Sequence, residues 1–82
     1  MVIEFAIDHY DHLLASCDLA SPEYEILKNG LVVPRVKNGK YERVVEIFAE
    51  MQDAQLLLAL AHRICPIAAP AITKAMSLAR GV

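Results

Sequence analysis

The chain has 82 residues, of which 56% are hydrophobic, and its formal net charge is −2. This length allows one domain with a single core, and the near-neutral charge argues against a surface built to attract nucleic acid over its whole extent. The most apolar stretch, residues 54–73, contains Arg63 and two prolines, which excludes a membrane span.

Residues 2–16 have the spacing of an amphipathic helix. The apolar positions recur three and four residues apart: Ile3, Ala6, Ile7, Tyr10, Leu13, Leu14. On this helix Glu4, Asp8 and Asp11 would share one polar face. Such an acidic face predicts a docking site for a basic surface of another protein.

A short second helix is predicted over residues 22–28. Ser21 is a good N-cap, Pro22 suits the first helical position, and Asn29-Gly30 suits the helix end. A strand over residues 24–28 is the alternative.

Residues 31–48 predict a β-hairpin. Asn38-Gly39 separates two runs that are rich in β-branched residues, and this dipeptide is the strongest short-range hairpin signal. Pairing outward from the turn places Val36 opposite Tyr41, Arg35 opposite Glu42 and Val33 opposite Val44. Pro34 then places its strand at an edge of the sheet. The alternative is an all-α fold in which one long helix runs over residues 41–65, because the apolar residues there also keep helical spacing.

Two further helices complete the predicted fold. Residues 50–64 are apolar nearly all round, so this helix should lie at the centre, and Pro70 starts a final helix that ends at Arg80. We therefore predict that residues 1–82 form a single small α+β domain with about four helices and one β-hairpin.

The hairpin concentrates basic residues. It carries Arg35, Lys37, Lys40 and Arg43, with Lys28 nearby and Glu42 as its only acid. A basic β-ribbon can follow nucleic-acid phosphates, so residues 28–43 are a second candidate binding site. By contrast, residues 1–25 hold six acids and no lysine or arginine, and this asymmetry favours head-to-tail association.

The histidines and cysteines offer two chemical alternatives. His9, His12, His62 and Cys65 could hold zinc if their helices met, and Cys65 beside a histidine could act as a nucleophile. The spacing of Cys65 suits a core residue, so we predict no catalytic residue, no metal site and no cofactor. With two cysteines and no signal peptide in view, we expect reduced thiols and a cytoplasmic protein.

The second half of the chain resembles a group of small phage and prophage accessory proteins. In these a short hairpin leads into a helix that begins Asp-Ala-x-x-Ile/Leu, matched here by Asp53-Ala54-Gln55-Leu56, and a proline (here Pro66) precedes a last apolar helix. The resemblance covers roughly residues 31–80. This chain departs from it in a slightly long spacing from Asp53 to Pro66 and in an added N-terminal helix. The resemblance implies a phage-encoded protein that acts by binding.

The sequence thus predicts a non-enzymatic interaction protein. A body of this size cannot bury all its apolar side chains, so a protein partner, including a second copy in a homodimer, should cover the remainder. We expect the chain to bind and modulate or inhibit a host or defence protein. The alternative is a small nucleic-acid-binding regulator that uses the basic hairpin.

Overall fold

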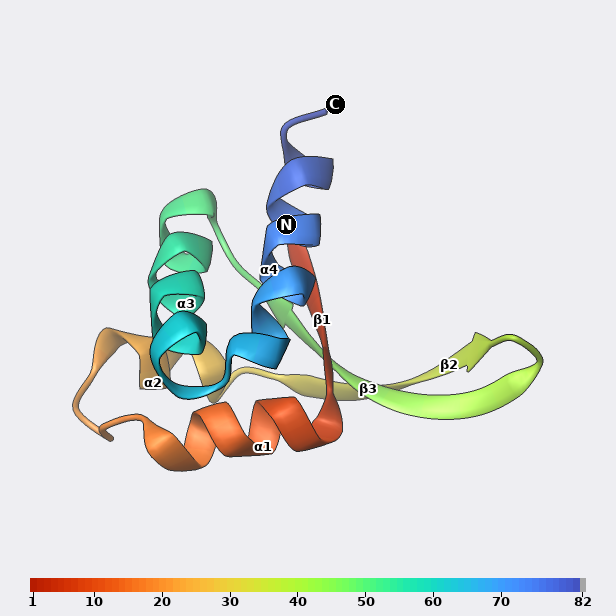
Figure 1. The fold of residues 1–82 in the computed structure, drawn as a ribbon, viewed down its shortest axis with the longest axis horizontal. Helices are drawn as coiled ribbons and strands as arrows, with labels where there is room; N and C mark the ends of the chain where they lie inside the picture. The colour runs from red at the N-terminus through yellow and green to blue at the C-terminus, as the bar shows by residue number, and fades with distance from the viewer. Residues whose placement is uncertain (82) are drawn as a thin grey trace.

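A computed structural model describes residues 1–81, which form an α+β domain with a three-stranded antiparallel sheet and four helices (Figure 1). The long helix considered for residues 41–65 does not form, because residues 40–48 are a strand. None of the helices described is both long and apolar enough to cross a membrane. The elements in chain order are β1 Val2–Ala6, α1 Ile7–Ser16, α2 Pro22–Leu27, β2 Leu31–Lys37, β3 Lys40–Phe48, α3 Met51–Ile64, a 3-10 turn Pro66–Ala68 and α4 Ala69–Ala79.

The predicted helix over residues 2–16 is wrong in its first five residues. Val2–Ala6 form strand β1, which pairs with β3 and buries Ile3 and Phe5, and the helix begins at Ile7. Ile3, Phe5 and Ile7 alternate as in a strand, while Ile3, Ala6 and Ile7 also keep helical spacing, so periodicity alone does not decide so short a run. Pairing with β3 decides it.

The hairpin forms in the predicted register. Val36 pairs with Tyr41, Arg35 with Glu42 and Val33 with Val44. Asn38 and Gly39 have φ values of 53° and 76°, and a two-residue turn with both φ values positive matches the right-handed twist of the strands it joins. The second helix is also confirmed: the hydroxyl of Ser21 accepts a hydrogen bond from the amide of Tyr24, as expected of an N-cap.

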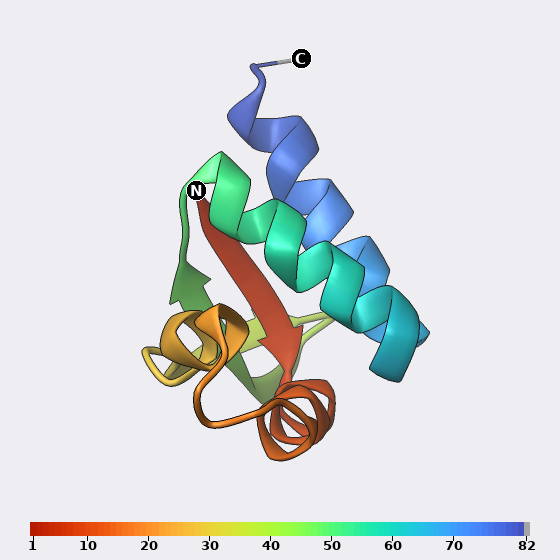
Figure 2. The same cartoon turned by 90° about the vertical axis from the view of Figure 1, so that its left-hand side faces the viewer.

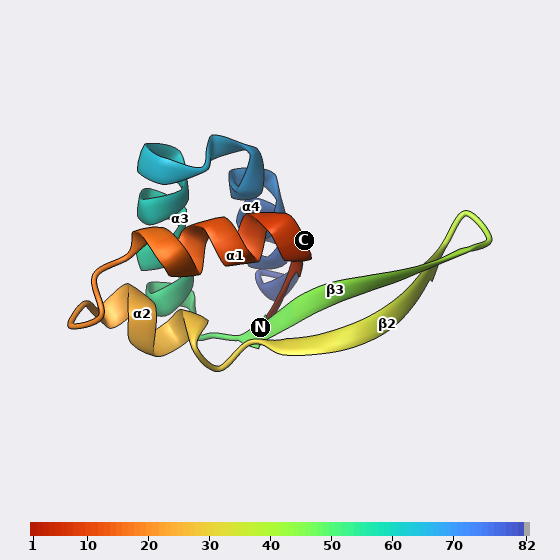
Figure 3. The same cartoon turned by 90° about the horizontal axis from the view of Figure 1, so that it is seen from below.

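The strand order β1-β3-β2 leaves β2 at an edge, as Pro34 predicted. β1 pairs only with residues 44–48 of β3, so residues 34–43 form a ribbon of two strands. We call residues 34–43 the arm. It projects well past the helices at one end of the molecule (Figure 3).

The core lies on one face of the sheet, between the strands and the helices. Ile3, Phe5, Val45 and Ile47 share that face and are buried. α3 and α4 lie side by side, and α4 also runs along β1 (Figure 2). α3 contacts each of the other three helices, but Leu56 on its outer side is 40% exposed. The prediction that this helix lies at the centre of the fold is therefore wrong. It is one member of the helical layer, and its outer side faces solvent.

Candidate interaction surface

An apolar stripe that no part of residues 1–81 covers begins at Val32, just before the arm, and continues along the arm. Val32, Pro34 and Val36 alternate along β2 and therefore share one face, and all three are exposed. Tyr41 pairs with Val36 and is the most exposed of the large hydrophobic side chains, at 76%. Arg43 pairs with Pro34 on the same face and is also exposed.

This stripe continues the core face of the sheet beyond the helices. Val32 pairs with Val45, which is 1% exposed and faces the core, whereas Val32 itself is 57% exposed. We call Val32, Pro34, Val36, Tyr41 and Arg43 the arm face. An isolated two-stranded ribbon is marginally stable in water, so an apolar face on such a ribbon is a surface that gains from being covered.

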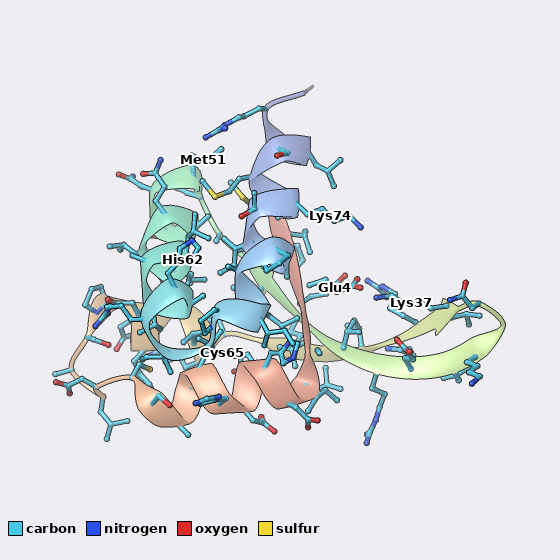
Figure 4. All side chains as sticks on the ribbon, in the orientation of Figure 1. Glu4, Lys37, Met51, His62, Cys65 and Lys74 are labelled. Carbon is cyan, nitrogen blue, oxygen red and sulfur yellow. The ribbon has the colours of Figure 1, made fainter. Side chains whose placement is uncertain are left out.

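The opposite face of the sheet carries a cluster of ion pairs. Glu4 and Glu46 lie directly opposite each other in β1 and β3, an arrangement that is unfavourable for like charges. Arg35 bridges them: its Nε lies 3.2 Å from Glu4 Oε2, and its Nη2 contacts Glu46 Oε2. Lys37 Nζ lies 3.1 Å from Glu4 Oε1, and Figure 4 shows these two side chains directed toward each other.

The titration of Glu4 reflects this cluster. Burial on its own would raise the pKa of the Glu4 carboxyl, but the hydrogen bonds and positive charges of Lys37 and Arg35 together outweigh burial. The net result is a pKa below its usual value of 4.5. The carboxylate form of Glu4 is therefore stabilised by folding.

The structure regroups the residues of the two predicted sites. Glu4 lies on a strand and forms ion pairs with Arg35 and Lys37, so one predicted acid is paired with two of the predicted bases. Asp8 and Asp11 remain on α1, exposed and without an ion pair within the described chain.

Lys40 and Arg43 are the hairpin cations that remain exposed without a carboxylate partner among residues 1–81.

A hollow of about 410 Å³ at the base of the arm brings the two predicted sites together. Glu4 and Asp8 line it from one side, and Lys37, Glu42 and Arg43 line it from the hairpin. The charges of the hollow are mixed, and it offers no strongly charged site of either sign.

The histidines and cysteines do not gather into a metal site in the part of the chain that the structure describes. No three metal-ligating side chains there gather as a metal site would require, so His9, His12, His62 and Cys65 stay apart as a set. Cys65 is buried at the end of α3, as its spacing predicted. Burial, and then the charge of Glu23, raises the pKa of the Cys17 thiol, which is the opposite of what activates a nucleophile.

Sequence reasoning missed the arm face, although its signal was present. Val32, Pro34 and Val36 alternate in a strand that Pro34 already placed at an edge, and the predicted register set Val36 beside Tyr41. The sequence did not reveal β1, and only the length of β1 shows where the sheet narrows to the two strands of the arm.

No match to this chain was found among protein-family models, curated proteins or solved structures.

Proposed function

We propose that this chain is a non-enzymatic interaction protein that binds another protein through the arm face. The observation that carries the proposal is the continuation of the sheet's apolar core face past the helices, from buried Val45 to exposed Val32, Val36 and Tyr41. Tyrosine and arginine are enriched in protein interfaces, and the arm face offers one of each beside its aliphatic side chains.

The partner packs across the face of the arm in this proposal and does not extend its edge. Pro34 has no backbone N–H, so a strand added along β2 would lack a hydrogen bond in the middle of its length. Affinity therefore depends on side chains, with Tyr41 and Val36 as the apolar anchors.

The ion pairs favour a protein partner over nucleic acid. The four hairpin cations Arg35, Lys37, Lys40 and Arg43 lie in the sheet with three carboxylates, Glu4, Glu42 and Glu46, which leaves one net positive charge. Binding that follows a phosphate backbone gains its affinity from several unneutralised cations. One net charge fits a protein surface with an apolar centre and an acidic border better.

The resemblance of residues 31–80 to phage and prophage accessory proteins supports a host or defence protein as the partner, modulated or inhibited by occupation of one of its surfaces. We place this interaction in the cytoplasm. The free thiols of Cys17 and Cys65 suit a reducing compartment.

A pair of matched variants tests the proposal. Phe48 and Val36 are equally exposed, at 66%, but Phe48 lies on the opposite face of the sheet. Proteins bound by the immobilised wild-type chain from a host extract should be lost from the V36S/Y41S variant and retained by F48S. Calorimetry with the purified partner should then reproduce that order.

Two results would contradict the proposal. One is equal retention by V36S/Y41S and wild type, provided that circular dichroism shows both to be folded. The other is steeply salt-dependent binding to duplex DNA that K40E/R43E abolishes, which would assign the arm to nucleic acid.

A further inference from the structure

The molecule carries complementary surfaces at its two ends. The Asn38-Gly39 turn of the arm and the loop between α1 and α2 lie at opposite ends of the long axis, which measures 39 Å (Figure 1). At the arm, Val36 and Tyr41 are exposed on the same face as the unpaired cation Arg43, and the unpaired cation Lys40 lies next to Tyr41 in sequence, on the opposite face.

The loop end also presents an exposed apolar side chain, here beside an acid. Leu19 is 73% exposed, and Asp18 beside it is exposed and makes no ion pair within the described residues. Asp11 lies midway along α1, the helix that leads into this loop, and is likewise exposed and without an ion pair among the described residues. We call Asp18 and Leu19, together with Asp11 on the adjoining helix, the acidic end. It offers an apolar side chain with acids nearby, which is the complement of an apolar ribbon with bases nearby.

We propose that a second copy of this chain covers the arm face, with each arm lying on the acidic end of the other copy. One chain cannot satisfy this complementarity internally, because its two surfaces lie at opposite ends of its length. Two copies placed side by side and antiparallel bring each arm to the other's acidic end at the same time. The result is a closed, two-fold symmetric dimer in which both contacts are identical.

This pairing rests on the proposed use of the arm face as a docking surface, and it adds a regulatory consequence. A partner that presents an apolar and acidic surface competes with the second copy for the arm. The free arm, and with it partner binding, is then favoured by dilution. The net charge of −2 per copy is small, so repulsion between copies opposes the dimer only weakly.

A charge-exchange experiment tests the dimer. K40E/R43E reverses the arm, D11K/D18K reverses the acidic end, and K74E reverses an exposed cation of α4 as the matched control. In sedimentation velocity, wild type and K74E should dimerise, whereas each double variant alone should have its dimer dissociation constant raised at least about tenfold.

An equal mixture of the two double variants should dimerise again, because each reversed arm then meets a reversed end and each native arm a native end. Circular dichroism checks that every variant is folded. Y41S should weaken the dimer without changing charge.

The proposal is overturned if wild type stays monomeric up to near-millimolar concentration, if the mixture stays monomeric, or if species continue to grow beyond two copies. A monomeric wild type whose partner capture still depends on Val36 and Tyr41 would remove the dimer and leave the proposed function standing. A wild-type dimer that captures no partner through Val36 and Tyr41 would support the dimer and contradict the proposed function.

Discussion

Gly30, which follows α2, lies tightly between Tyr10 of α1 and Val45 of β3. A Cβ atom added there would lie 2.7 Å from Val45 Cγ1 and 2.8 Å from Tyr10 Cε1. The Tyr10 hydroxyl also donates a 2.5 Å hydrogen bond to the carbonyl oxygen of Leu27, so the ring is not free to move away. The glycine is needed here for space, since its φ is not in the left-handed region.

We predict that G30A lowers the free energy of unfolding by about 1–3 kcal/mol, as overpacking of a filled core does. Urea denaturation measures the loss. V45A removes one of the crowded atoms, so G30A should cost less in a V45A background than in wild type. Equal costs in the two backgrounds would show that the Val45 contact does not limit the site.

Arg35 holds together two carboxylates that would otherwise repel each other across β1 and β3. We predict that R35M lowers the free energy of unfolding at pH 7 by roughly 1 kcal/mol, in line with the effect of opposed like charges in a sheet. K40M, which breaks no ion pair of the described chain, should change it by less than about 0.5 kcal/mol.

The R35M effect should depend on pH in one direction. The pKa of Glu4 is lowered by folding, so its contribution to stability is fully present above its ordinary value of 4.5 and is lost as the pH falls through the lower folded value. Denaturation curves of wild type and R35M should therefore converge as the pH falls below 4.5. A difference that stays constant into this acidic range would assign the effect of Arg35 to packing of its aliphatic chain.

At the scale of elements, neighbouring residues of β3 separate the covered face of the sheet from the open one. Ile47 is fully buried among the helices, whereas Phe48 is 66% exposed on the other side. We predict that I47A lowers the free energy of unfolding by about 2–5 kcal/mol and that F48A changes it by less than about 0.5 kcal/mol. Thermal unfolding of the two variants measures both. Similar losses would mean that something covers the outer face as well.

The elements differ in how far local sequence determines them. The hairpin and its register followed from Asn38-Gly39 and Pro34, since a two-residue turn fixes every pair beyond it. Helix α2 followed from Ser21 and Pro22. β1 did not, because its five residues become a strand only by pairing with β3, which lies about forty positions further along the chain.

The candidate site was predictable only in part for the same reason. The sequence correctly predicts that Arg35 and Glu4 are charged surface residues. The ion pair between them could not be predicted, because it forms only when β1 lies in the sheet. Without that strand, Glu4 was assigned to a helical face with Asp8 and Asp11, and Arg35 was counted as a free cation.

For the whole molecule, several large hydrophobic side chains stay exposed, among them Leu19, Tyr41 and Leu78. The accessible area is 5208 Å², against about 4,900 Å² expected for a compact chain of 9.1 kDa. A projecting ribbon adds to the accessible area because it exposes both of its faces. The exposed side chains therefore reflect the shape of the fold, and a covering partner would bring the area toward that of a compact body.

Pro34 also affects how prone the exposed apolar ribbon is to aggregate. Bare sheet edges seed fibril growth when each incoming chain finds a continuous row of hydrogen-bonding groups. The proline interrupts that row midway along β2. A strand added along β2 would lack a hydrogen bond at Pro34, and this disfavours edge-to-edge stacking of the exposed ribbon.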